Sequence, residues 1–213
     1  MLNHEVRVWY NPELKSSNFM VPGVICLILT VMTMILGSVS LVKEQEQGTM
    51  EQLIVTPIKG WELILGKILP FVVIGYVDII IILLVGCFWF KVPIMGSIPL
   101  LLGLSGLFLL NTLGLGLFIS TISRTQQQAM MTAFFFMMPF VLLSGFIFPI
   151  ANMPEFIQYL TYLVPLRYFL VIIRGICLKG VGLPVLLPEV IPLVLLGLGI
   201  FALSVARFHK KLE

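Results

Sequence analysis

Residues 19–42 read FMVPGVICLILTVMTMILGSVSLV, an apolar run without a single charged side chain. About 20 such residues are enough for an α-helix to cross the hydrocarbon core of a bilayer. Three more runs reach that length and a fifth is shorter but nearly pure apolar, so the expected spans are 19–42, 68–90, 98–122, 130–150 and 190–206. Backbone amides in lipid must be satisfied internally, and no alternating barrel pattern competes. The sequence therefore predicts an all-α, polytopic membrane protein with five transmembrane helices.

The composition limits what the chain can do on its own. Of its 213 residues, 59% are hydrophobic and only 11% are charged, which is outside the range of soluble globular chains. No stretch is long and polar enough for a separate soluble domain, and no P-loop motif is present, so we expect no enzyme activity and no bound nucleotide. The net charge of +3 is spread out, which argues against nucleic acid. Three scattered cysteines and two distant histidines favour neither a disulfide framework nor a metal or cofactor site.

The two ends of the chain bear on its orientation. Residues 1–18 form a polar tail and residues 207–213 a basic one, RFHKKLE, and five spans place these tails on opposite sides. Lys and Arg are almost evenly divided between the two sides, so their number alone does not decide the orientation. The compact basic tail directly after the last span favours a cytoplasmic C-terminus and an N-terminus outside the cell.

A polar island, KEQEQGTMEQLIVTP at 43–57, separates the first two spans. On a helical wheel its apolar and polar residues fall on opposite faces, which predicts a short amphipathic helix ending near Thr56 and Pro57. A membrane-surface helix is disfavoured because the segment carries one cation against three glutamates, the wrong sign for anionic lipid. A solvated loop remains open, and docking onto a basic groove of a cytoplasmic protein is favoured. The residues of this candidate docking site are Glu44, Glu46, Gly48, Thr49, Glu51, Gln52, Thr56 and Pro57.

The long connection 151–189 has apolar residues at helical spacing and two arginines seven residues apart. We predict two short helices folded against or into the outer leaflet, with Arg167 and Arg174 on one face turned toward water or protein. An ordinary surface loop is the alternative.

Asp78 and Asn111 are polar residues in the middle of the second and third expected spans. An acidic group at that depth costs about 2.5–3.5 kcal/mol, so Asp78 should face the bundle interior. It is either a protonated side chain bonded between helices or, with Asn111, a polar point in a substrate or proton path.

Several stretches, in order, resemble the permease subunits of type-2 ABC transporters, in particular the bacterial export and multidrug efflux branch. They are KEQEQGTMEQLIVTPIKGWELILGKILP at 43–70, VPIMGS at 92–97, GLGLFISTISRTQQQAM at 114–130, LLSGFIFPIANMP at 142–154 and LVPLRYFLVIIRGICLKG at 163–180. The resemblance implies that the 44–56 helix is a cytoplasmic coupling helix touching the ATP-binding subunit. It implies that the helical pieces around Arg167 and Arg174 are outer re-entrant helices.

The resemblance also implies a function. The expected protein is the permease of an ATP-driven exporter in the bacterial inner membrane, moving a drug, lipid or other hydrophobic substrate, with ATP and Mg bound by a separate ABC ATP-binding subunit. A second permease copy or paralogue, membrane lipid and a periplasmic adaptor are the other expected partners. The chain resembles the C-terminal five-span part of a six-span permease, without the usual first span and extracytoplasmic domain. The alternatives are a proton-coupled secondary transporter using Asp78, or an inactive truncated fragment.

Overall fold

The computed structural model describes residues 16–48 and 60–212. Within these residues the chain forms seven α-helices, one short 3-10 helix and no β-strand. The elements are α1 (Ser16–Glu46), α3 (Gly60–Phe88), α4 (Ile98–Ile122), α5 (Gln126–Leu143), η1 (Ile150–Asn152), α6 (Glu155–Thr161), α7 (Pro165–Lys179) and α8 (Leu183–Leu212). The predicted all-α, polytopic membrane fold is confirmed.

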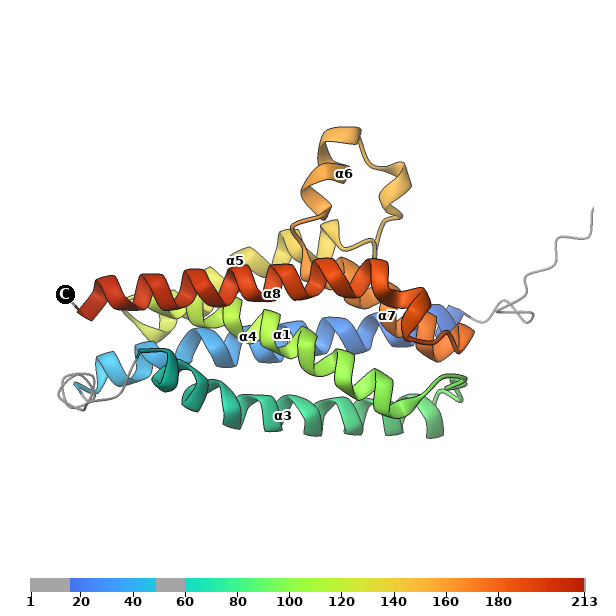
Figure 1. Ribbon diagram of the computed structural model, residues 1–213, viewed down its shortest axis with the longest axis horizontal. Helices are drawn as coiled ribbons and strands as arrows, with labels where there is room; N and C mark the ends of the chain where they lie inside the picture. The colour runs from blue at the N-terminus through green and yellow to red at the C-terminus, as the bar shows by residue number, and fades with distance from the viewer. Residues whose placement is uncertain (1–15, 49–59, 213) are drawn as a thin grey trace, which may run out of the picture.

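Five long helices alternate in direction along the long axis of the bundle (Figure 1). The C-terminal ends of α1 and α8 lie at the same end of the bundle, where α3 and α5 begin. We call this the α1–α3 end. The connections between α3 and α4 and between α7 and α8 lie at the opposite end, and α6 stands out from the side of the bundle. The topology therefore gathers the end of α1, the start of α3 and the connection from α4 to α5 at one place.

Four of these helices are long and apolar enough to cross a membrane: Met20–Glu46, Leu65–Phe88, Ile98–Ile122 and Leu183–Arg207. A fifth crossing results if the bent pair α6 and α7 counts as one span. The predicted span 130–150 falls on α5, which is not among the four. Three glutamines at its start and an internal proline lower the hydropathy of its 18 residues, and the helix ends at Leu143.

The two short helices predicted between residues 151 and 189 are present as α6 and α7, joined at an angle of 78°. The last helix begins at Leu183, well before the predicted start at residue 190. A proline is tolerated in the first turn of a helix, where its missing N–H has no partner to lose. Pro184 occupies such a position, and the helix continues past Pro188 and Pro192.

The helix α1 crosses α4 at very short range where Gly37 faces Gly116. A Cβ atom added to Gly116 would lie 2.7 Å from the carbonyl oxygen of Met34 and 2.9 Å from the Cα of Gly37. Small residues at such a crossing let two backbones approach closely, which is how helices pack in lipid. Glycine is therefore required at this crossing by the neighbouring backbone.

Hydroxyl groups bridge the same two helices on both sides of the crossing. Thr33 Oγ1 donates to Thr112 Oγ1 at 2.7 Å. Ser120 Oγ accepts from the backbone N–H groups of Leu41 and Val42, at 3.0 Å each. These hydroxyls are buried, and each bond joins α1 to α4. The α1–α4 pair is thus joined by buried hydrogen bonds as well as by close backbone packing.

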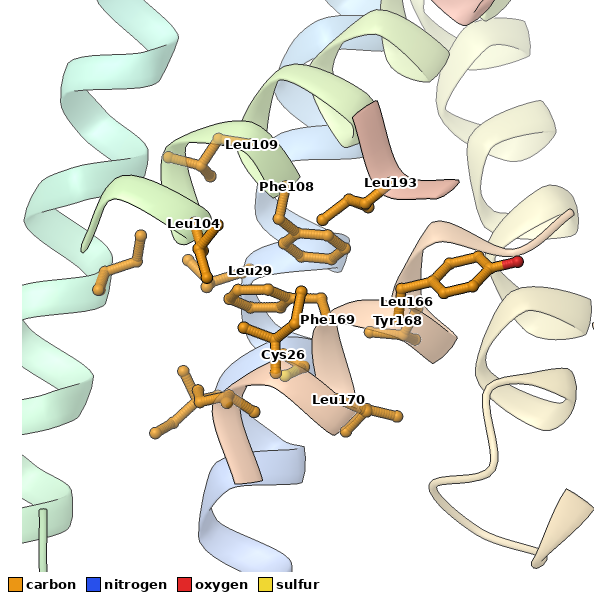
Figure 2. Packing of buried hydrophobic residues seen from close by; sticks show 14 of the residues in the cluster. Cys26, Leu29, Leu104, Phe108, Leu109, Leu166, Tyr168, Phe169, Leu170 and Leu193 are labelled. Carbon is orange, nitrogen blue, oxygen red and sulfur yellow. The ribbon is translucent and has the colours of Figure 1, made fainter. Parts of the chain in front are cut away.

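The centre of the core is an aromatic stack between α4 and α7. The rings of Phe108 and Phe169 lie 4.2 Å apart, centroid to centroid, at an interplanar angle of 8°. Leu29 of α1 lies beside the Phe169 ring and Cys26 below it (Figure 2). Phe108 and Phe169 are fully buried. The short helix α7 is thereby fixed inside the bundle rather than laid on its surface.

Candidate functional site

The first candidate site is the α1–α3 end, where Glu44 and Glu46 lie. Both residues belong to the last turn of α1, which ends at Glu46, and Gly48 follows with a φ of +71°. A residue in the left-handed region ends a right-handed helix. The prediction of one helix over 44–56 is therefore wrong at its start, because these residues prolong α1. Thr49, Glu51, Gln52, Thr56 and Pro57 lie outside the described residues.

Glu44 points toward α3 and forms an ion pair with Lys67. Lys67 is 14% exposed and Glu44 is 30% exposed, so the pair lies partly shielded between the two helices. Partial shielding strengthens the attraction between the charges relative to a surface pair. The carboxylate expected on a docking face is instead engaged, at least in part, within the bundle.

Glu46 links α1 to α5. One carboxylate oxygen accepts the backbone N–H of Gln126 at 2.8 Å, and the other accepts its side-chain amide. Gln126 is the first residue of α5, whose N-cap is Thr125, so the carboxylate lies at a helix N-terminus, where a negative charge is favourable. Thr125 itself accepts from the N–H of Gln128 at 3.1 Å. The end of α1 is therefore bonded directly to the start of α5.

Lys67 and Gln126 are two residues of this site that were not predicted from the sequence. Lys67 stands alone in an apolar run, and Gln126 is one of three consecutive glutamines. The Thr-x-x-Gln spacing at 125–128 is a helix-start signal that could have placed Gln126 at the beginning of a helix. Nothing in the sequence pairs it with a residue 80 positions earlier.

Asn111, one of the two polar residues expected in the spans, is bonded within the bundle. Asn111 is fully buried, and its amide donates to the carbonyl oxygens of Leu107 at 2.9 Å and Leu193 of α8 at 3.1 Å. Asp78 lies half-buried on α3, and no hydrogen bond joins it to Asn111 within the residues that the structure describes. Asn111 thus fits the role of a polar tie between helices. A path through Asp78 stays a prediction.

Arg167 holds the corner between α6 and α7. Its guanidinium lies 4.1 Å from the ring centroid of Tyr162 and donates to the hydroxyl of Thr161. The Thr161 hydroxyl donates in turn to the carbonyl oxygen of Gln158 at 2.6 Å. The hydroxyl of Tyr168 donates to the backbone carbonyl oxygen of Tyr162 at 2.9 Å. The bend between α6 and α7 is therefore held by a cation–π contact and several hydrogen bonds.

Arg174 lies two turns further along α7 and faces α1. A Cβ atom added to Gly23 of α1 would lie 3.4 Å from Nη2 of Arg174 and 2.2 Å from the ring of Phe146. Gly23 thus leaves room for Phe146 beside the arginine. Both arginines are half-buried and turned toward protein, which is one of the two environments expected for their face.

We expect Arg167→Ala to loosen the α6–α7 corner and to lower the free energy of unfolding by about 1–3 kcal/mol. The variant loses both the cation–π contact and the charged hydrogen bond to Thr161. Hydrogen exchange of residues 155–168, followed by mass spectrometry, should rise in this variant. Arg124→Ala at the other end of the bundle is the matched control. Equal exchange in both variants would show that Arg167 does not hold the corner.

Comparison with known proteins agrees with this architecture. The sequence model of the family described as ABC-2 type transporter matches residues 7–178. The chain is similar to the "Probable multidrug ABC transporter permease YbhR" of Escherichia coli K12, at 37% identity over 97% of this chain and 56% of the relative. It is 41% identical to the "Probable multidrug ABC transporter permease YbhS" of the same organism, over 88% of this chain and 50% of the relative. The "Inner membrane transport permease YhhJ" of the same organism shares 30% identity with the chain, over 99% of this chain and 56% of the relative. The chain thus spans about half the length of these relatives.

Proposed function

The chain belongs to the ABC-2 type transporter family, and on this premise we propose that it forms the membrane permease part of an ATP-driven exporter. The observation that carries the proposal is the family match, together with relatives named as multidrug permeases. The substrate is a drug, lipid or other hydrophobic molecule. ATP and Mg bind to a separate ABC ATP-binding subunit, and this chain supplies the path through the membrane.

In the proposed assembly two permeases, identical or paralogous, work with two ATP-binding subunits in the bacterial inner membrane. The α1–α3 end faces the cytoplasm, with the C-terminus on that side and the N-terminus outside. The ATP-binding subunit docks on the segment that follows α1. A periplasmic adaptor is a further partner in this proposal.

The contacts at the α1–α3 end support a route for the motion. A segment moved by the ATP-binding subunit pulls on the end of α1, and Glu46 is bonded to the start of α5 while Glu44 is paired with α3. A displacement there reaches three helices at once. The ATP-binding subunit must bind one arrangement of these helices more tightly than the other, since equal binding would shift nothing.

The test is efflux from proteoliposomes that hold the permease and its ABC ATP-binding subunit, with ethidium as the probe. We expect efflux that requires ATP and stops when the ATP-binding subunit is left out. Efflux that follows an imposed proton gradient without ATP, and that is lost in Asp78→Asn, would overturn the proposal in favour of a proton-coupled transporter. Asp78→Asn with undiminished ATP-driven efflux would agree with it.

We expect Glu46→Ala to reduce substrate-stimulated ATP hydrolysis about fivefold while the ATP-binding subunit still co-purifies. The variant removes two hydrogen bonds to a charged acceptor, and such bonds are stronger than those between neutral groups. Gln45→Ala, one residue away and exposed, is the control. Unchanged stimulation in Glu46→Ala would show that the bond to Gln126 does not transmit motion.

A further inference from the structure

A cleft of about 630 Å³ lies between α1 and α3, next to the α1–α3 end. Its inner walls include Leu36 and Val39 of α1 and Phe71 of α3, while Lys43, Glu44 and Lys67 line it toward the end of the bundle. Along α1 the step from Leu36 to Lys43 is about 10 Å at the rise of an α-helix. The cleft therefore changes from apolar to charged along its length, and its volume is that of a small-molecule site.

The surroundings of the cleft are apolar as well. Side chains along α3 are strongly exposed, among them Leu69 at 66% and Val73 at 56%. In a membrane such a surface contacts lipid, and α3 runs along the edge of the bundle (Figure 1). A molecule that enters the cleft from this side comes from the bilayer.

The charge at the mouth has a definite sign. Among the described residues that line the cleft, two lysines against one glutamate leave one net positive charge, and Lys43 is exposed while Lys67 is held by Glu44. Basic pockets between transmembrane helices bind anionic headgroups, and long lysine side chains reach the interface from within the apolar zone. An apolar interior below a basic mouth is complementary to a molecule with an apolar chain and an anionic headgroup.

We propose that this cleft binds an anionic phospholipid, with its phosphate between Lys43 and Lys67 and one acyl chain along Leu36, Val39 and Phe71. Glu44 competes with the phosphate for Lys67 and so weakens binding. The site does not depend on the transport function proposed above, and its test needs no ATP-binding subunit.

The test is a titration of the delipidated full chain with dioleoyl phosphatidylglycerol and with dioleoyl phosphatidylcholine, read by native mass spectrometry. We expect one phosphatidylglycerol to bind several-fold more tightly than phosphatidylcholine. Lys43→Gln and Lys67→Gln should each weaken phosphatidylglycerol binding about fivefold, while Glu44→Gln should strengthen it. Lys91→Gln, the same charge change at the opposite end, should have no effect. Equal affinity for both lipids, or weaker binding in Glu44→Gln, would overturn the proposal.

Substitutions at two glycines test the acyl-chain contact apart from the headgroup contact. A Cβ atom at Gly66, which lines the cleft, meets no atom of the described residues within 4 Å, so Gly66→Leu adds an apolar side chain to the cleft wall. It should reduce phosphatidylglycerol binding about tenfold or more without lowering the melting temperature. A Cβ atom at Gly103 of α4 likewise meets no such atom, so Gly103→Leu is the matched control. Undiminished binding in Gly66→Leu, or soluble glycerol phosphate binding as tightly as the lipid, would place no acyl chain in the cleft and overturn the proposal.

Discussion

Replacing Gly116 by leucine is expected to leave little folded protein, because it forces apart α1 and α4, which are closely packed and hydrogen-bonded to each other. The atoms that a new Cβ meets at less than 3 Å are backbone atoms of α1, which cannot rotate away. Overpacking a tight interior costs about 1–3 kcal/mol and more where nothing can move, and here separation also breaks the bond between Thr33 and Thr112. We expect a loss of about 3 kcal/mol or more in the free energy of unfolding. Thermal unfolding in detergent, together with the yield of monodisperse protein, measures it.

The same substitution at Gly103 of α4 is the control, since a Cβ atom there meets no atom of the described residues within 4 Å. Gly37→Ala tests the crossing from the other helix, because its Cβ would lie 2.9 Å from the carbonyl oxygen of Leu113. We expect it to destabilise the protein less than Gly116→Leu but more than Gly103→Leu. A Gly116→Leu protein that melts with the wild type would show that the two helices are not held at this distance.

The class of the fold follows from the sequence because the bilayer requires long, internally bonded helices. Runs of apolar residues near 20 in length mark α1, α3 and α4 well. The length of an apolar run fails to predict the helix where polar residues or prolines lie inside the helix. Three glutamines open α5, and prolines that break most helices are carried inside α8. In both cases tertiary packing decides where the helix begins and ends.

Close packing of the helices could also be predicted only in part from the sequence. Glycines in the third predicted span indicate tight packing, but their spacing does not say which neighbour each one meets. The structure places Gly116 against α1 and Gly114 against Ile200 of α8. A Cβ at Gly106 would meet the hydroxyl of Tyr76 on α3, whereas one at Gly103 would meet nothing. These partners depend on helix order and rotation, which periodicity alone does not specify.

The candidate site was only partly predictable for the same reason. The sequence singled out Glu44 and Glu46 by their sign in an apolar chain and assigned both to a face that binds another protein. The structure gives each a partner within the chain, 23 and 80 residues away in sequence. Both partners come close through the antiparallel arrangement of α1, α3 and α5. The prediction that the segment beyond Gly48 docks onto an ATP-binding subunit stays a prediction.

Reversing the charge of Lys67 should have the second large effect. In Lys67→Glu two carboxylates face each other in a partly shielded cleft, and the free energy of unfolding should fall by about 1–3 kcal/mol, between the values for exposed and buried pairs. Glu44→Lys should be similarly harmful because two lysines then meet. The double variant Glu44→Lys/Lys67→Glu restores opposite charges and should recover most of the stability. Thermal unfolding of the four proteins gives the coupling energy of the pair as a double-mutant cycle.

The same four proteins separate an internal role of Glu44 from a docking role. If Glu44 acts through Lys67, then co-purification of the ABC ATP-binding subunit should follow stability, weak in the single variants and recovered in the double variant. If Glu44 contacts a basic group on the partner, the double variant should be stable and yet fail to bind, since its charge is reversed toward the partner. Gln45→Lys adds a positive charge next to Glu44 without touching the pair and controls for the change in net charge. Because the shielded pair engages Glu44 within the bundle, we expect the first outcome, and a stable double variant without the ATP-binding subunit would contradict it.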